Sequence, residues 1–194
     1  MARTKAFEPT KVLEKALHLF WRQGYDATSM DDLVKVLGIS RSSIYDTFGD
    51  KRQLFLQALE SYRQRSSEVL IAVLKEHPNP KQALREILNQ AMKETASDQE
   101  GKGCFMANTS VEMANYDPEI AHISRENKDR VIQAFTSAIR RGQKQGEISK
   151  KFPATHLAEF IYATYNGLQV VGKYDRDERK LKQSVKLALS LLDE

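Results

Sequence analysis

Side chains that can hydrogen-bond nucleic acid are concentrated in one short segment of this chain: Arg41, Ser42, Ser43, Tyr45 and Thr47. Arginine can bond to guanine or to phosphate, and serine and threonine hydroxyls can bond to phosphates or base edges. Short side chains also let a helix enter the major groove deeply. The other interpretation is a helical hairpin in an all-α core, with serines that only cap helix ends. Spacing alone leaves both interpretations open.

The residues before this segment predict the first of two short helices. Met30, Leu33, Val34 and Leu37 have the spacing of one apolar helical face. Ser29 is a good N-cap, and Asp32 stands where an acid can return the hydrogen bond. Gly38 suits the left-handed turn that ends a helix.

The segment itself predicts a second helix over residues 41–47, capped by Ser40 and ended by Gly49. Ile44 and Phe48 form its inner face, which leaves the polar side chains outside. Asp50, followed by Gln53, can cap a third helix that begins at Lys51. Together these elements predict a helix-turn-helix.

Residues 9 to 60 resemble the DNA-binding domain of the TetR family of bacterial transcriptional regulators. The resemblance is carried by Phe20-Trp21-Arg22-Gln23-Gly24-Tyr25 and by the continuous run GYDATSMDDLVKVLGISRSSIYDTFGDKRQLF. It implies a protein that binds a double-stranded operator, and most often a repressor that a small-molecule inducer releases from a palindrome.

The resemblance also implies which residues contact DNA. Tyr45, Thr47 and Lys51 match the family's contacting positions most strongly. We expect Arg41, Ser42 and Ser43 to face the groove as well, and Thr28, Ser29 and Lys51 to contact phosphate. Asp46 is a departure, because an acid there could accept from a cytosine amine or could repel phosphate. Arg3 and Lys5 form either a basic arm that contacts DNA or a disordered terminus.

The rest of the chain predicts further helices. The helix that begins at Lys51 meets no proline before Pro78, and later helices are expected over about 80–96, 103–114, 153–172 and 177–192, with a long helix from 118 whose end is bracketed by Gly142 and Gly146. The predicted fold is all-α. The resemblance implies that residues 1–50 form a DNA-binding head and that residues 51–194 form a ligand-binding and dimerisation body.

The last two helices are the predicted dimer interface, because in the family this pair packs against its symmetry mate. The interface residues expected are Phe160, Tyr165, Gly167, Leu168, Val185 and Leu189. A twofold dimer would double the phosphate contacts and read a palindrome. Alternatively, these helices only complete the core of one subunit.

A sensor also needs an apolar pocket with a few polar groups. We expect its lining among Cys104, Phe105, Asn108, Thr109, Glu112, Tyr162 and Tyr165. Cys104 follows Gly101-Lys102-Gly103 at a predicted helix N-terminus, where a thiolate is stabilised. The segment Gly103–Asn108 also resembles a branch of the family in which some members sense electrophiles through a cysteine. The apolar flank of Cys104 equally fits a buried packing residue.

Composition narrows the function further. Among 194 residues, with a net charge of +4, no apolar run reaches the length of a membrane span and no signal peptide precedes the first helix, so a cytoplasmic protein is expected. One cysteine and four scattered histidines predict neither a disulfide framework nor a metal site. No cofactor or catalytic motif is found, so we expect no enzyme; the alternative is a small helical enzyme or an electrophile-handling protein that uses Cys104.

Overall fold

The computed structural model describes residues 7–193, so Arg3 and Lys5 lie outside the described residues. Helices account for its regular structure, which confirms the all-α prediction. The chain divides into two compact units, the first extending to Gln64 and the second beginning at Arg65. This division lies inside α4 (Lys51–Glu76) rather than at its start, where the sequence places it. The first turns of α4 belong to the first unit because their apolar side chains are buried there.

The first unit is built from α1 (Pro9–Gln23), α2 (Met30–Leu37), α3 (Arg41–Phe48) and the start of α4. Phe20 of α1 is fully buried, and its ring meets the ring of Phe55 of α4 edge-on, with centroids 5.1 Å apart. Leu33 and Ile44 bring α2 and α3 to the same core, because both side chains are fully buried. The apolar stripes of the four segments therefore determine how the short helices are held.

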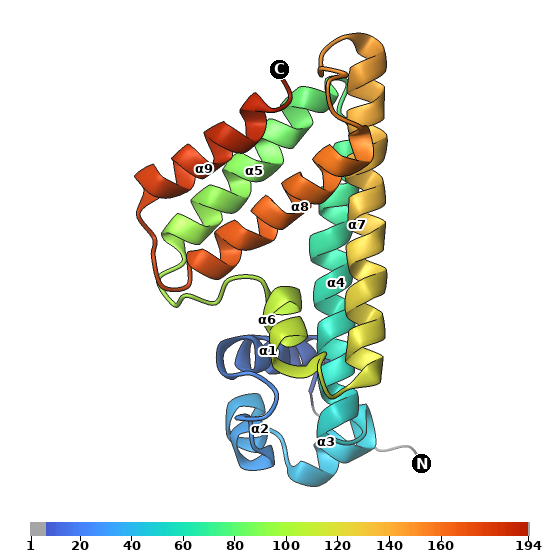
Figure 1. Ribbon diagram of the computed structural model, residues 1–194. Helices are drawn as coiled ribbons and strands as arrows, with labels where there is room; N and C mark the ends of the chain where they lie inside the picture. Colours follow the sequence, from blue (N-terminus) through green and yellow to red (C-terminus); the bar gives the residue numbers. More distant parts are fainter. Residues whose placement is uncertain (1–6, 194) are drawn as a thin grey trace. The chain divides into compact units, whose positions relative to one another are not determined.

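The second unit contains the end of α4 and five further helices: α5 (Pro80–Ser97), α6 (Phe105–Met113), α7 (Pro118–Gln145), α8 (Ala154–Val171) and α9 (Glu178–Ser190). Helices α5, α8 and α9 pack together, and α7 lies against α8 (Figure 1). Their common core includes the fully buried Leu84, Phe135 and Ile161. No helix within residues 7–193 is both long and apolar enough to cross a bilayer.

Polar contacts join α7 to the part of α4 that belongs to the second unit. Ser67 donates a 2.8 Å hydrogen bond from Oγ to Oδ1 of Asn127, and both side chains are buried. Arg130 of α7 pairs with Glu68 of α4. Arg141 donates to the carbonyl oxygens of Leu74, Lys75 and His77 at 2.9–3.0 Å. A side chain of α7 therefore satisfies carbonyl groups that the end of α4 leaves without helical partners.

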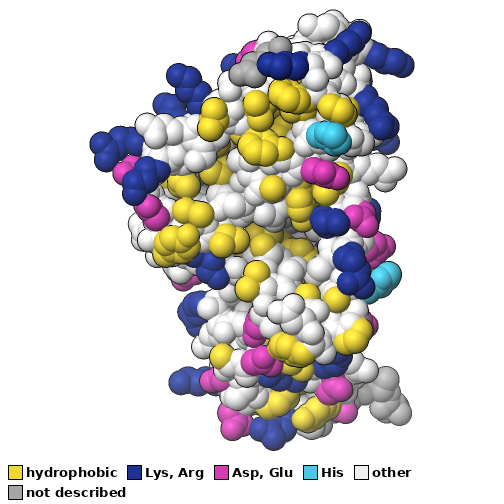
Figure 2. All heavy atoms as spheres, viewed as in Figure 1, with side chains coloured by type: hydrophobic (Ala, Val, Ile, Leu, Met, Phe, Trp, Pro, Cys, Tyr) yellow, Lys and Arg dark blue, Asp and Glu magenta, His cyan; other side chains and the backbone are white. Residues whose placement is uncertain are grey.

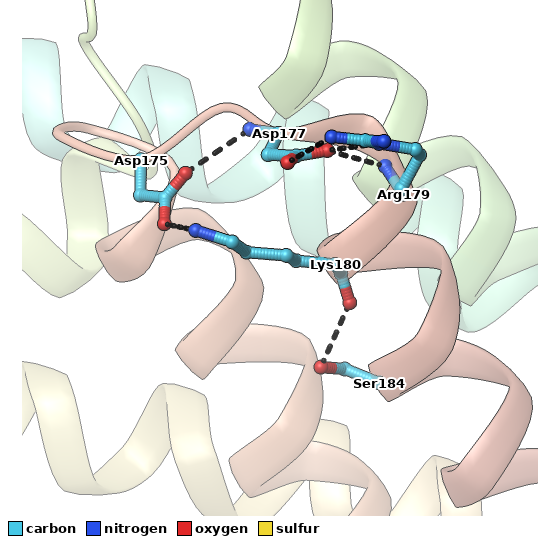
Figure 3. Close-up of polar contacts among 5 residues, drawn as sticks. All are labelled: Asp175, Asp177, Arg179, Lys180 and Ser184. Atoms are coloured by element: carbon cyan, nitrogen blue, oxygen red, sulfur yellow. Dashed lines mark hydrogen bonds and ion pairs between the residues drawn. The ribbon is translucent and has the colours of Figure 1, made fainter.

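Charged side chains close the turn between α8 and α9 (Figure 3). Asp175 accepts a 2.7 Å contact from Nζ of Lys180, and Asp177 caps α9 by accepting from the backbone N–H of Arg179. The Lys180 contact lowers the pKa of the Asp175 carboxyl group. Side-chain hydrogen bonds from the Arg179 guanidinium, followed by its backbone N–H, lower the pKa of the Asp177 carboxyl group. A lowered pKa in the folded state means that this stabilisation is present near neutral pH and is lost as the pH falls through the folded value.

We predict that Arg141→Ala destabilises the second unit by about 1–3 kcal/mol, because three carbonyl groups lose a charged hydrogen-bond donor. Calorimetric melting measures the effect. Arg140→Ala is the matched control, since Arg140 is the preceding residue and is exposed, and it should change stability by less than about 0.5 kcal/mol. Equal melting temperatures for the two variants would contradict the role given to Arg141.

Candidate nucleic-acid interface

Local hydrogen bonds and glycines set the ends of α2. Ser29 Oγ accepts from the N–H of Asp32 at 3.1 Å, and the N–H of Ser29 donates to Oδ2 of Asp32 at 3.0 Å, which confirms the expected capping box. Gly38 ends the helix with φ +70°, a left-handed conformation that glycine adopts without strain. The turn into α3 is therefore determined by residues at its two ends.

Helix α3 presents one buried and one exposed face. Ser40 caps it by accepting from the N–H of Ser43 at 3.1 Å. Ile44 and Phe48 are buried, at 0% and 5% exposure, so the helix can rotate little about its axis. This leaves Arg41, Ser42, Tyr45 and Asp46 exposed and Ser43 and Thr47 half-buried.

The exposed face carries donors and acceptors that suit base edges. Tyr45 is 47% exposed and presents both a ring and a hydroxyl group. The hydroxyls of Ser42 and Ser43 each lie 2.9 Å from Ser40 Oγ, so they form one small hydroxyl cluster at the start of the helix. Arg41 Nη2 lies 2.7 Å from Oδ1 of Asp31 in α2. Sequence reasoning missed this pair, because the two residues are ten positions apart and share no local motif.

Of the three residues predicted to contact phosphate, Lys51 and Ser29 are accessible and Thr28 is buried. Lys51 begins α4, and its ammonium lies 4.2 Å from the centre of the Tyr25 ring, which favours a fixed position for the charge. Ser29 is exposed, although its hydroxyl also bonds to Oδ2 of Asp32 at 2.6 Å.

Thr28 requires a correction. Its side chain is fully buried, and its hydroxyl donates a 2.6 Å hydrogen bond to the carbonyl of Gly24. A hydroxyl enclosed in this way has no surface to offer a phosphate. Thr28 instead fixes the turn between α1 and α2.

Comparison with known proteins agrees with this geometry. Residues 12–58 match the family described as bacterial regulatory proteins, tetR family, and residues 80–188 match the tetracyclin repressor-like C-terminal domain. The chain is 31% identical over its full length to the HTH-type transcriptional regulator YezE of Bacillus subtilis, all of which is covered. It is 30% identical to the HTH-type transcriptional repressor ComR of Escherichia coli, over 99% of this chain and 92% of ComR.

The chain belongs to the TetR family of transcriptional regulators. Among solved structures, a cysteine mutant of the TetR family regulator CifR in complex with 26-bp operator DNA is similar, with a TM-score of 0.87 and 25% identity over 98% of this chain and all of that one. The protein is thus a DNA-binding transcriptional regulator, and the proteins it matches are regulators rather than enzymes. Dimeric assembly and response to small molecules are general in the TetR family.

One of the ligand residues predicted for this TetR-family chain lines a large cavity of the second unit. An open cavity of about 890 Å³ is lined by α4, α5, α8 and α9, and of the predicted residues only Tyr165 lines it. Burial raises the pKa of the Tyr165 and Tyr162 phenols, so both are neutral hydrogen-bonding groups. Within residues 7–193, no group of three acids, histidines or cysteines could hold a metal ion.

The predicted ligand residues on α6 do not line this cavity. Phe105 and Thr109 are 1% exposed, and Oγ1 of Thr109 has no hydrogen-bond partner among the described residues. Asn108 bonds to the carbonyl of Lys102 and to Nζ of Lys173. Glu112 is half-buried. Cys104 is buried and caps α6, with Sγ 3.5 Å from the N–H of Ala107. Lys102, the expected neighbouring cation, pairs with Glu100.

The predicted dimer residues separate by exposure. Leu168 and Val185 are 3% and 2% exposed within one subunit and belong to its core, so they are corrected to core residues. Tyr165 and Leu189 pack partly against the same core. Phe160 is 45% exposed, and a Cβ atom built at Gly167 would meet nothing within 4 Å.

We predict different consequences for Lys51 and Thr28. Lys51→Ala should weaken binding to all DNA sequences alike and lower the salt slope of binding by about 1, because one phosphate contact is lost. Thr28→Val should leave that slope unchanged and destabilise the first unit by about 1–2 kcal/mol, because a buried hydrogen bond is removed. Salt titrations of DNA binding and thermal melting separate the two. A slope that falls for Thr28→Val would restore it to the phosphate contacts.

Proposed function

We propose that this TetR-family regulator is a homodimeric repressor whose two α3 helices read the half-sites of a palindromic operator, and that a small molecule in the second unit releases it. The observation that carries the proposal is the two-sided character of α3. Its inner face buries Ile44, and its outer face carries the polar side chains of Arg41, Ser42, Tyr45 and Thr47. Selection of bound duplexes from a random pool tests it, because an inverted repeat is the expected product. An enriched site without twofold symmetry would contradict the palindrome.

The exposed face of α8 supports the dimer. Phe160, Ala163, Gly167 and Val171 follow one another at intervals of three or four residues and therefore share a side of the helix. On α9, Leu187 is 68% exposed. Hydrophobic side chains are grouped on the face of the second unit that carries α8 and α9 (Figure 2). Exposed hydrophobic side chains that share one face in this way are typical of a subunit interface.

We predict that Gly167→Leu lowers dimer stability and operator affinity without lowering the melting temperature of the subunit. The added side chain has open space within one subunit, so only a partner helix would be displaced. Light scattering and operator binding measure the two effects. Thr155→Leu, at an exposed α8 position outside this stripe, is the control. A Gly167→Leu protein that remains fully dimeric would contradict this interface.

We assign the inducer to the cavity between α4 and α5. Leu70, Ile87 and Met92 supply an apolar wall, and Asn89, Tyr165 and the charged residues supply polar groups. The volume of about 890 Å³ is that of a site for a drug-sized molecule. A ligand that shifts α4 and weakens DNA binding must itself be bound more weakly by the DNA complex, because the coupling free energy is reciprocal.

We predict that compounds that release the operator also stabilise the free protein, by about 2.7 kcal/mol at one hundred times their dissociation constant. Asn89→Trp should abolish this response while operator binding persists, because the indole fills part of the cavity. Asn115→Trp, at an exposed position outside the cavity, should respond like the wild type. An undiminished response in Asn89→Trp would move the inducer site elsewhere.

A further inference from the structure

The charge arrangement at the start of α3 has a feature that DNA binding by basic residues does not explain. Arg41, the first residue of α3, is paired at 2.7 Å with Asp31, an acid in the first turn of α2. The side chains are 53% and 90% exposed, so the pair lies on the surface rather than in the core. An acid on a DNA-facing surface repels phosphate. The presence of Asp31 beside Arg41 therefore calls for a role other than attraction to DNA.

The dipole of α2 modestly stabilises an acid in its first turn, but helix capping does not require Asp31. Exposed ion pairs contribute little to folding stability, because solvent screens them and ordering two long side chains costs entropy. The capping box of α2 uses Asp32, which leaves the carboxylate of Asp31 outside it. The contact with Nη2 is the one side-chain hydrogen bond that the structure gives Asp31 and Arg41 within residues 7–193.

A carboxylate in this position has a clear consequence for the guanidinium. Arginine reads guanine through two parallel N–H donors that must meet O6 and N7 together. A free arginine side chain loses much rotamer freedom when it adopts that geometry. Asp31 contacts a single terminal nitrogen, so further N–H donors of Arg41 remain available while the group is held.

We propose that Asp31 is a positioning residue that orients Arg41 toward a guanine in each half-site, and that it raises specificity while lowering affinity for DNA in general. The proposal rests on the proposed base-reading role of α3. Its two effects have opposite signs: holding Arg41 strengthens binding to the correct base, whereas the negative charge weakens binding to every sequence.

The chain offers a matched control for the charge effect. Asp46 is also an exposed acid on the outer side of α3, but the structure shows no contact between Asp46 and Arg41. Asp31→Asn and Asp46→Asn therefore remove the same charge, and only the first replaces the ionic partner of the guanidinium with a neutral amide, whose oxygen is a weaker acceptor. Both substitutions are nearly isosteric, so each variant should melt at the wild-type temperature.

The test measures affinity for the selected operator, for operators with each base pair replaced in turn, and for random duplex at one salt concentration. Both variants should bind random duplex more tightly than the wild type. Asp31→Asn should also lose about two- to fivefold of the discrimination at one G·C pair per half-site, which must be the pair at which Arg41→Ala loses its discrimination. Asp46→Asn should keep that discrimination.

The double variant completes the test. If Asp31 acts through Arg41, adding Asp31→Asn to Arg41→Ala should cause no further loss at that base pair. An Asp31→Asn protein that keeps wild-type discrimination would make Asp31 a purely repulsive charge and overturn the proposal. Loss of discrimination that adds to the loss in Arg41→Ala would also overturn it. A wild-type protein that selects no sequence at all would instead reject base reading by α3, which is a separate outcome.

Discussion

The burial of Ile44 and Phe48 is the constraint on which the DNA-binding surface depends. Helices α2 and α3 have eight residues each, which is too short for a helix to be stable by itself in water. They exist because caps close their ends and because Leu33, Ile44 and Phe48 join the core around Phe20 and Phe55. The exposure of Arg41 and Tyr45 follows, since a helix with one face fixed has its other face fixed as well. The buried Thr28 also helps to hold α2 in place, because its hydrogen bond to Gly24 closes the turn that leads into α2.

Helix α4 takes part in both units, and its surroundings in the second unit differ on its two sides. Toward α7 it is held by the buried Ser67–Asn127 hydrogen bond and by the carbonyl contacts of Arg141. A buried polar pair is satisfied in one register only, so it determines how the two helices align. Val69, Leu70 and Val73 instead line an open cavity. A ligand that fills the cavity therefore acts on the less restrained side of a helix that is shared with the DNA-binding unit.

The sequence predicts features that neighbouring residues determine, such as helix ends. It does not predict contacts between residues that are far apart in the chain. Helix ends follow from caps, glycines and prolines, as the capping box of Ser29 and Asp32 illustrates. An apolar stripe reveals which side of a helix is buried, but it does not reveal whether a partner subunit or the chain itself covers it. Leu168 and Val185 therefore proved to be core residues, while Phe160 is exposed. The cavity could not be predicted either, because it arises where α4 and α5 separate, and no periodic pattern marks that separation.

The acids on the outer side of α2 and α3 bear on how a small regulator selects its site. The net charge of the chain is only +4, so the general attraction to DNA is moderate. A genome presents an enormous excess of competing sites, and occupancy of the operator depends on the ratio of specific to general affinity. Adding lysines would raise both affinities together and leave that ratio unchanged. The charge of an acid likewise weakens both affinities, so the ratio rises only because the acid fixes an arginine that reads a base. Asp31 is placed to do this because α2 and α3 are held by a shared core rather than by contacts on their DNA-facing side.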